Sequence, residues 1–228
     1  MKKTLRREAV RPDATAGQDI LARLRSDIVS SVFAPGARLK FADLTRRYDV
    51  GIGTLREALS QLVSEGFVTL EAGKGFRVAP VSTGELAEIT EHYIDFETRS
   101  LVDAIANGDD EWESRIVASH HRLSIIESLP WEERMARHTE WVERHREFHG
   151  SLVAACNKLW LLRLRALMFD QLDRYRFLTK SAPQGLGSRK FQEHRMIMDA
   201  TLKRDGALAS RLIEDHIRDT AAEAWKSL

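Results

Sequence analysis

The chain lacks the features of secreted and membrane proteins. Its 228 residues include a single cysteine, Cys156, so no internal disulfide can form and a reducing compartment is expected. No run of about 18 uncharged apolar residues is present, and such a run is needed to span a membrane. The basic N-terminus is not followed by the apolar segment of a signal peptide. The sequence therefore predicts a cytoplasmic protein without a membrane partner.

Common catalytic motifs are also missing. The sequence has no His-Glu-x-x-His helix and no nucleophile elbow. Gly73 and Gly75 flank a lysine, and they fit a turn between strands better than a phosphate-binding loop. These absences disfavour most enzyme classes. A metal-dependent enzyme that uses histidines remains the alternative to a binding protein.

Charge is distributed unevenly along the chain. The whole sequence has a net charge of +1, but residues 1–80 contain 14 Lys and Arg against 9 Asp and Glu, a net of +5. The remainder is therefore at −4. A basic N-terminal third on a mildly acidic body indicates a polyanion-binding module attached to a second domain.

Apolar periodicity divides this basic third into short helices. Residues 1–16 are polar, contain Pro12 and are expected to form a flexible arm. Residues 18–32 show helical spacing, and a Pro-Gly turn follows. A second short helix is predicted over residues 41–48.

Residues 50–66 predict a turn followed by an amphipathic helix. Thr54 and Glu57 have the spacing of a capping box, and Gly66 stands where a left-handed residue would end the helix. The apolar positions at helical spacing are Leu55, Leu59, Leu62 and Val63. A glycine-bearing turn before a helix with an early arginine is typical of a DNA-reading helix-turn-helix.

The pattern after Gly66 changes to that of β-strands. Residues 67–70 and 76–79 are short β-type runs, and the segment between them carries Lys74 at its tip. Three helices and a two-stranded wing predict a winged helix-turn-helix domain over residues 17–80.

Residues 81–228 predict a second domain made only of helices. Ser82 and Glu85 form a possible capping box, so the first helix should begin near Thr83. Breaks at Pro, Gly and Asn residues then delimit helices over 84–106, 110–128, 131–156, 158–180, 189–204 and 206–225. The fold class is mainly α, a winged helix-turn-helix followed by a six-helix bundle.

Three segments of the N-terminal half form a distinctive pattern: Phe33-Ala34-Pro35-Gly36-Ala37-Arg38-Leu39, Leu55-Arg56-Glu57-Ala58-Leu59 and Gly75-Phe76-Arg77-Val78. This pattern resembles the GntR superfamily of bacterial transcription regulators. The C-terminal helices resemble the effector domain of its FadR type, the FCD kind. The resemblance implies a cytoplasmic, metabolite-responsive repressor that binds a palindromic double-stranded DNA operator as a homodimer.

The recognition helix departs from the family pattern at its start. Gly51 and Ile52 occupy positions where the family commonly has a Ser-Arg pair, whose arginine reads a base edge, whereas Arg56 is retained. Base reading is therefore expected to depend on Thr54, Arg56 and close backbone approach near Gly53. The further candidates for DNA contact are Ile52, Arg38, Lys40, Arg46, Arg47 and Lys74.

Four histidines are candidates for a metal site in the second domain. His145 and His149 are four residues apart, so both project from one helix face, and His194 and His216 lie in later helices. Spacing alone is a weak indication, because His92, His120, His121 and His138 show that histidine is frequent here. The alternative is a polar core in which the imidazoles bind one another or water.

The resemblance strengthens the metal hypothesis. FCD domains of the metal-binding kind carry an Asp-x-x-Phe-His segment and two later histidines, and His149, His194 and His216 match these three. His145 takes the place of the aspartate. A divalent metal is therefore implied, with zinc expected first and nickel or manganese as alternatives.

The same resemblance implies a small carboxylate effector, for example a dicarboxylate such as glutarate, bound beside the metal. A guanidinium group could bind its carboxylate. Arg174 and Arg176, in an aromatic-flanked segment, are the preferred candidates over Arg99 and Arg163. Tyr93, which replaces a frequent arginine of the family, and Glu97 one helical turn later are the remaining candidate effector residues.

Overall fold

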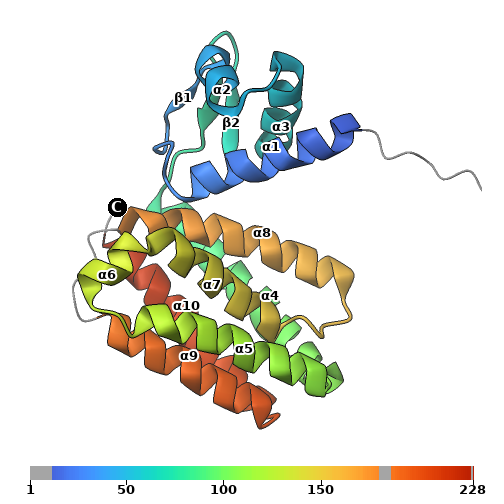
Figure 1. Ribbon diagram of the computed structural model, residues 1–228, viewed down its shortest axis with the longest axis vertical. Coiled ribbons are helices and arrows are strands. Elements are labelled where there is room, and N and C mark those ends of the chain that lie inside the picture. Colours follow the sequence, from blue (N-terminus) through green and yellow to red (C-terminus); the bar gives the residue numbers. More distant parts are fainter. Residues whose placement is uncertain (1–11, 180–185, 227) are drawn as a thin grey trace, which may run out of the picture. The chain divides into compact units, whose positions relative to one another are not determined.

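The computed structural model describes residues 12–179, 186–226 and 228. The chain divides into two compact units, Met1–Val81 and Ser82–Leu228, which are described separately. Both are mainly helical, and the only sheet in the described part of the chain lies in the first unit (Figure 1). Among the described residues, every helix is too short or too polar to cross a membrane.

The N-terminal unit is a winged helix-turn-helix. Its helices are α1 (Pro12–Val29), α2 (Phe41–Tyr48) and α3 (Ile52–Ser64), and its strands are β1 (Arg38–Leu39), β2 (Val68–Glu71) and β3 (Gly75–Val78). The strands form an antiparallel sheet in the order β1-β3-β2, with Leu39 opposite Phe76 and Val68 opposite Val78. The order of three helices and a hairpin confirms the predicted winged helix-turn-helix. Strand β1 was not predicted, because two residues are too few to show the alternating pattern of a strand.

The first helix starts earlier than predicted. Residues 12–16, which were expected in a flexible arm, belong to α1, because a proline is well tolerated in the first turn of a helix. The helix also ends at Val29 and not at residue 32. Ser31, two residues after this end, adopts a left-handed conformation with a φ of 57°. Residues 1–11 of the predicted arm lie outside the described residues.

The start of α3 is also different from the prediction. Gly51, in extended conformation with φ of −70° and ψ of 157°, is the N-cap, and no side chain caps this helix end. Thr54 is therefore the third residue inside the helix, and the predicted capping box with Glu57 is wrong. The predicted end is confirmed, because Gly66 has a φ of 81° directly after the C-cap.

A shared core fixes the orientation of α3 within its unit. Leu55, Leu59 and Leu62 are fully buried, together with Leu24 of α1 and Leu44 of α2. At the periphery, the Arg25 guanidinium binds the Glu65 carboxylate through bonds of 2.7–3.0 Å, which joins α1 to the end of α3. The opposite face of α3 is left exposed.

The C-terminal unit is all-α. Its helices are α4 (Thr83–Asn107), α5 (Asp110–Glu127), α6 (Trp131–Ala136), α7 (His138–Leu152), α8 (Leu159–Arg176), α9 (Leu186–Leu202) and α10 (Gly206–Trp225), and the 3₁₀ turn η1 (Phe177–Thr179) follows α8. The predicted cap of the first helix is confirmed, since the Ser82 hydroxyl accepts a bond of 3.1 Å from the Glu85 backbone N–H. Helix α4 packs on α8 and α10, and α5 packs on α7 and α9 (Figure 1).

The prediction of six helices is wrong in one place. The single helix expected over residues 131–156 is two helices, α6 and α7, separated at Arg137, whose φ of −107° and ψ of 25° are not helical. The described part of this unit therefore has seven α-helices. No proline or glycine stands at the break, so local sequence could not reveal it. The Arg137 guanidinium instead binds Glu140, at 2.7 and 2.9 Å.

Candidate metal centre and DNA-facing helix

Four histidines converge inside the C-terminal unit, as the sequence predicts. His145 and His149 project from α7, His194 from α9 and His216 from α10. Each offers one ring nitrogen, and these four atoms lie within 4.8 Å of one another. All four side chains are buried, the most exposed at 4%. Ring nitrogens at this spacing can share one metal ion.

Two glutamates, the buried Glu127 and the half-buried Glu193, orient two of these imidazoles. Nδ1 of His194 lies 3.1 Å from the Glu127 carboxylate, and Nδ1 of His216 lies 2.8 Å from that of Glu193. A carboxylate only accepts hydrogen bonds, so each contact assigns the proton to Nδ1 and leaves the Nε2 lone pair available. Such carboxylate–histidine pairs commonly support metal ligands.

Several ring nitrogens of the cluster are buried without a hydrogen-bond partner among the described residues. They are Nε2 of His194 and both ring nitrogens of His149. Leaving a buried polar atom unpaired costs about 1–3 kcal/mol. A metal ion would accept one lone pair from each of these two rings.

His145 is directed at an arginine. Its two ring nitrogens lie 3.2 and 3.0 Å from the two terminal nitrogens of Arg176. A neutral imidazole has one lone pair, and a guanidinium only donates, so one of the two contacts places a donor against a donor. This region is therefore suited to receive an additional acceptor, such as a carboxylate oxygen.

Three histidines of the cluster favour their uncharged form. Burial lowers the pKa of His145, His149 and His216 well below the usual value, and repulsion from neighbouring cationic groups lowers it further. The neutral imidazole is the form that binds metals.

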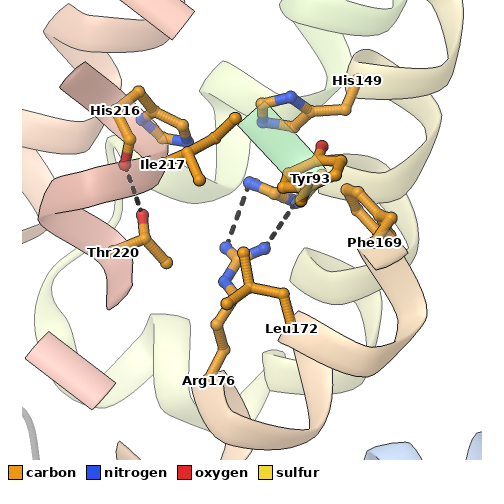
Figure 2. Close-up of a pocket in the computed structure, with 9 residues that line it drawn as sticks. Tyr93, His149, Phe169, Leu172, Arg176, His216, Ile217 and Thr220 are labelled. Carbon is orange, nitrogen blue, oxygen red and sulfur yellow. Dashed lines mark hydrogen bonds between the residues drawn. The ribbon is translucent and has the colours of Figure 1, made fainter. Parts of the chain in front are cut away.

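A pocket adjoins the histidines (Figure 2). Figure 2 shows Arg176 directing its guanidinium into the pocket, with Phe169 and Leu172 on the same helix, α8. The pocket is lined by Tyr93, His145, His149, Phe169, Leu172, Arg176, His216, Ile217 and Thr220. Burial raises the pKa of Tyr93, so its hydroxyl stays protonated. The lining therefore combines a cation, hydroxyls and apolar walls.

Two of the four predicted effector residues line this pocket, Tyr93 and Arg176. Glu97 is fully buried and already ion-paired with Arg165. Arg174 donates to Gln171 at 2.6 Å and is not among the pocket-lining residues. The prediction missed the apolar walls, although the spacing of Phe169, Leu172 and Arg176 places them on one face of a helix.

The exposed face of α3 in the other unit carries the predicted DNA-reading residues. Ile52, Gly53 and Arg56 are exposed, and the Arg56 guanidinium lies 5.7 Å from the centre of the Phe41 ring. Thr54 is half-buried. At about 100° per residue, Thr54 and Arg56 point about 160° apart around the helix axis, whereas Ile52 and Arg56 share one edge.

The remaining basic residues that were predicted to contact DNA are exposed on the surface of the N-terminal unit. Arg38 lies on β1 and Lys40 directly before α2. Arg46 pairs with Asp43 at 2.7 Å. Lys74, at the tip of the hairpin, pairs with Glu71 at 3.3 Å and keeps 68% of its side chain exposed. Exposed ion pairs of this kind are weak, so these cations can exchange their partners for phosphates.

Comparisons with known proteins bear on both units. Residues 16–78 match the bacterial regulatory proteins of the gntR family, and residues 88–219 match the FCD domain. The chain is 40% identical over 198 residues to the HTH-type transcriptional repressor GlaR of Escherichia coli (strain K12), covering 85% of this chain and 89% of GlaR. It is 37% identical over 199 residues to the uncharacterized HTH-type transcriptional regulator BphR of Paraburkholderia xenovorans (strain LB400), covering 87% and 80%.

Solved structures share the fold at low identity. Escherichia coli McbR/YncC superposes with a TM-score of 0.80 at 16% identity, covering 92% of this chain and 97% of that one. A GntR regulator from Rhodococcus sp. RHA1 superposes with a TM-score of 0.74 at 21% identity, covering 94% and 99%.

Proposed function

Because this chain belongs to the GntR family of bacterial regulatory proteins and carries an FCD domain, it is a DNA-binding transcriptional regulator, and we propose that it is a metabolite-responsive repressor. In this proposal the N-terminal unit binds a palindromic operator, and the C-terminal unit binds a divalent metal and a small carboxylate. The observation that carries the second part is the convergence of four buried histidines beside Arg176.

The donor set supports a metal ion. Four neutral imidazoles match the preferences of zinc and nickel, whereas manganese favours carboxylate oxygens, so this set favours zinc or nickel. In the proposed site His145, His149, His194 and His216 are the ligands, and Glu127 and Glu193 orient two of them. The bound ion supplies a positive centre to which an anion can coordinate.

The charge balance beside the cluster supports an anionic ligand. All four proposed ligands are neutral, so the charge of the ion is opposed only from behind the ligands, by the carboxylates of Glu127 and Glu193. Arg176, which also pairs with Asp173 at 3.0 Å, lies at the same place. A carboxylate can bind both, while Phe169 and Leu172 pack against the carbon chain. A dicarboxylate such as glutarate is the first ligand to test.

The two-fold symmetry of palindromic operators supports a homodimer in this proposal. A palindromic operator presents two equivalent half-sites, which a two-fold dimer matches. Two of the relatives, GlaR and RspR of Escherichia coli, are named transcriptional repressors. The ligand acts only through its different affinity for the DNA-competent and the DNA-incompetent conformations.

The alternative to a regulator is a metal-dependent enzyme that uses the four histidines. The relatives that match most of the chain are transcriptional regulators, and the N-terminal unit is a DNA-binding module. The chain is accordingly a regulator and not an enzyme.

A thermal-shift screen tests the ligand-binding part of the proposal. The protein is melted with zinc or with chelator, in the presence of glutarate, other C4 to C6 dicarboxylates or amino acids. We expect zinc to raise the melting temperature and one class of acid to raise it further, only when zinc is present. Arg176→Ala should keep the zinc shift and lose the acid shift, whereas Arg163→Ala, an exposed position on the same helix, should keep both. No response to any acid, or an unchanged response in Arg176→Ala, would contradict the proposal.

A further inference from the structure

The first residue of the recognition helix is an exposed aliphatic side chain. Ile52 opens α3 and keeps 53% of its surface accessible, although its unit has a well-packed core. Isolated exposed aliphatic residues are common on protein surfaces, so exposure alone assigns no role. The position of Ile52 relative to the other faces of the helix is what gives it one.

The buried face of α3 fixes where Ile52 points. Leu55, Ala58, Leu59 and Leu62 face the core of the unit, and successive residues turn by about 100°. Ile52 and Arg56 therefore lie about 40° apart, and Ile52, about 20° from the direction of Leu59, stands where the buried face meets the exposed face. A helix that directs Arg56 at base edges in a major groove directs Ile52 at them too, one turn closer to the helix start.

The surroundings of Ile52 leave its side chain free to enter a groove. Gly51 and Gly53 flank it, and a Cβ placed on either glycine would meet no atom within 4 Å. No side chain caps this helix end. The start of the helix thus carries one apolar side chain between two positions without any, so the backbone and Ile52 can approach a base pair closely.

The chemistry of an aliphatic side chain selects its partner on DNA. The edges of bases in the major groove are polar except for the 5-methyl group of thymine, which is read by apolar contact. We propose that Ile52 reads the methyl group of a thymine in each operator half-site, next to the base contacted by Arg56. Ile52 is then a specificity-determining residue, whereas the half-buried Thr54 on the other edge is not.

Uracil provides a direct test, because it differs from thymine at this edge only by the missing methyl. Operators are first selected from a random double-stranded DNA library with the full-length protein. Each thymine of the selected site is then replaced singly by deoxyuridine, and binding is measured for the wild type, Ile52→Ala and Val32→Ala. Val32 is a matched control, an exposed aliphatic residue of the same unit at 50% accessibility.

The proposal predicts one sensitive thymine in each half-site. There, deoxyuridine should weaken the wild type and Val32→Ala about fourfold, as expected for one buried methyl group, and should leave Ile52→Ala unaffected. A library selected with Ile52→Ala should lose its preference for thymine at that position. Identical deoxyuridine profiles for wild type and Ile52→Ala would overturn the proposal, as would selection of no sequence by the wild type. Circular dichroism confirms that the exposed substitution leaves the fold intact.

Discussion

The Tyr175 hydroxyl accepts a hydrogen bond of 3.3 Å from the backbone N–H of Ser82, and it donates to the Glu85 carboxylate. Ser82 is the first residue of the C-terminal unit and the cap of α4. Burial, followed by the bond to Glu85, raises the pKa of Tyr175, so the hydroxyl remains protonated. Tyr175 directly precedes Arg176, which lines the pocket beside the histidines. The end of α8 therefore connects the pocket to the segment where the two units join.

Tyr175→Phe should weaken the response of DNA binding to the ligand. The substitution removes both hydrogen bonds but keeps the ring, so metal binding and ligand binding should persist while their coupling to DNA affinity falls several-fold. The measurement is operator affinity with and without the acid found in the thermal-shift screen. Tyr48→Phe removes a comparable bond to Asp27 in the other unit and should leave the coupling unchanged. An unaltered ligand response in Tyr175→Phe would contradict the role assigned to this contact.

Glu127→Gln should weaken metal binding without unfolding the protein. Glutamine is nearly isosteric, but it lacks the charge that holds the Nδ1 proton of His194 and strengthens the ligand. Loss of such a partner typically costs tenfold to a hundredfold in metal affinity. Competition with a chromogenic chelator measures the affinity, and Glu132→Gln, at an exposed position of α6, is the control. Equal affinities in the two variants would show that Glu127 does not support the metal.

The metal-free protein should lose stability as the pH falls below about 6.5. In the folded chain the pKa of His145, His149 and His216 is lowered, whereas in the unfolded chain these groups protonate near 6.5. The unfolded state then binds more protons, so the free energy of unfolding decreases by up to about 1.4 kcal/mol per pH unit for each such histidine. Urea unfolding between pH 7.5 and 5.5, with chelator present, measures the slope. His149→Gln should flatten it more than His121→Gln, which changes an exposed residue.

Arg56→Ala should abolish specific operator binding and leave metal content unchanged. The side chain is exposed on the edge of α3 that we propose meets DNA, and its guanidinium lies 5.7 Å from the centre of the Phe41 ring, so its loss should not affect folding. Arg115→Ala, an exposed arginine of α5 that pairs with Glu111, should bind the operator normally. Electrophoretic mobility shifts and elemental analysis of the same preparations separate the two properties. Normal operator binding by Arg56→Ala would exclude this residue from base reading.

Several helix ends could be predicted because they depend on the residue at the end itself. Gly66 at the end of α3 and Ser82 at the start of α4 act through their own conformational and capping preferences. The break at Arg137 could not be predicted, because no proline or glycine stands there and arginine has no strong preference against the helix. The capping box at Thr54 failed for a related reason, since the helix had already begun at Ile52.

Part of the candidate metal site could be predicted because some of its residues are recognisable by type. The histidines stand out by residue type, and Arg176 by its charge. The roles of Glu127 and Glu193 could not be found from sequence, because surface glutamates are common and only the fold places these two against His194 and His216. The ion pair that engages Glu97 with Arg165 likewise joins residues far apart in the chain.

The uncapped start of α3 should affect the rate of amide hydrogen exchange in the free protein. Since Gly51 offers no side chain to the first turn, the amide protons there have only water as a partner before DNA arrives. Their exchange with deuterium should be fast in the free protein and slow on the operator. In the proposed complex, the end of the helix that meets DNA is thus also the end whose free amides DNA would bind.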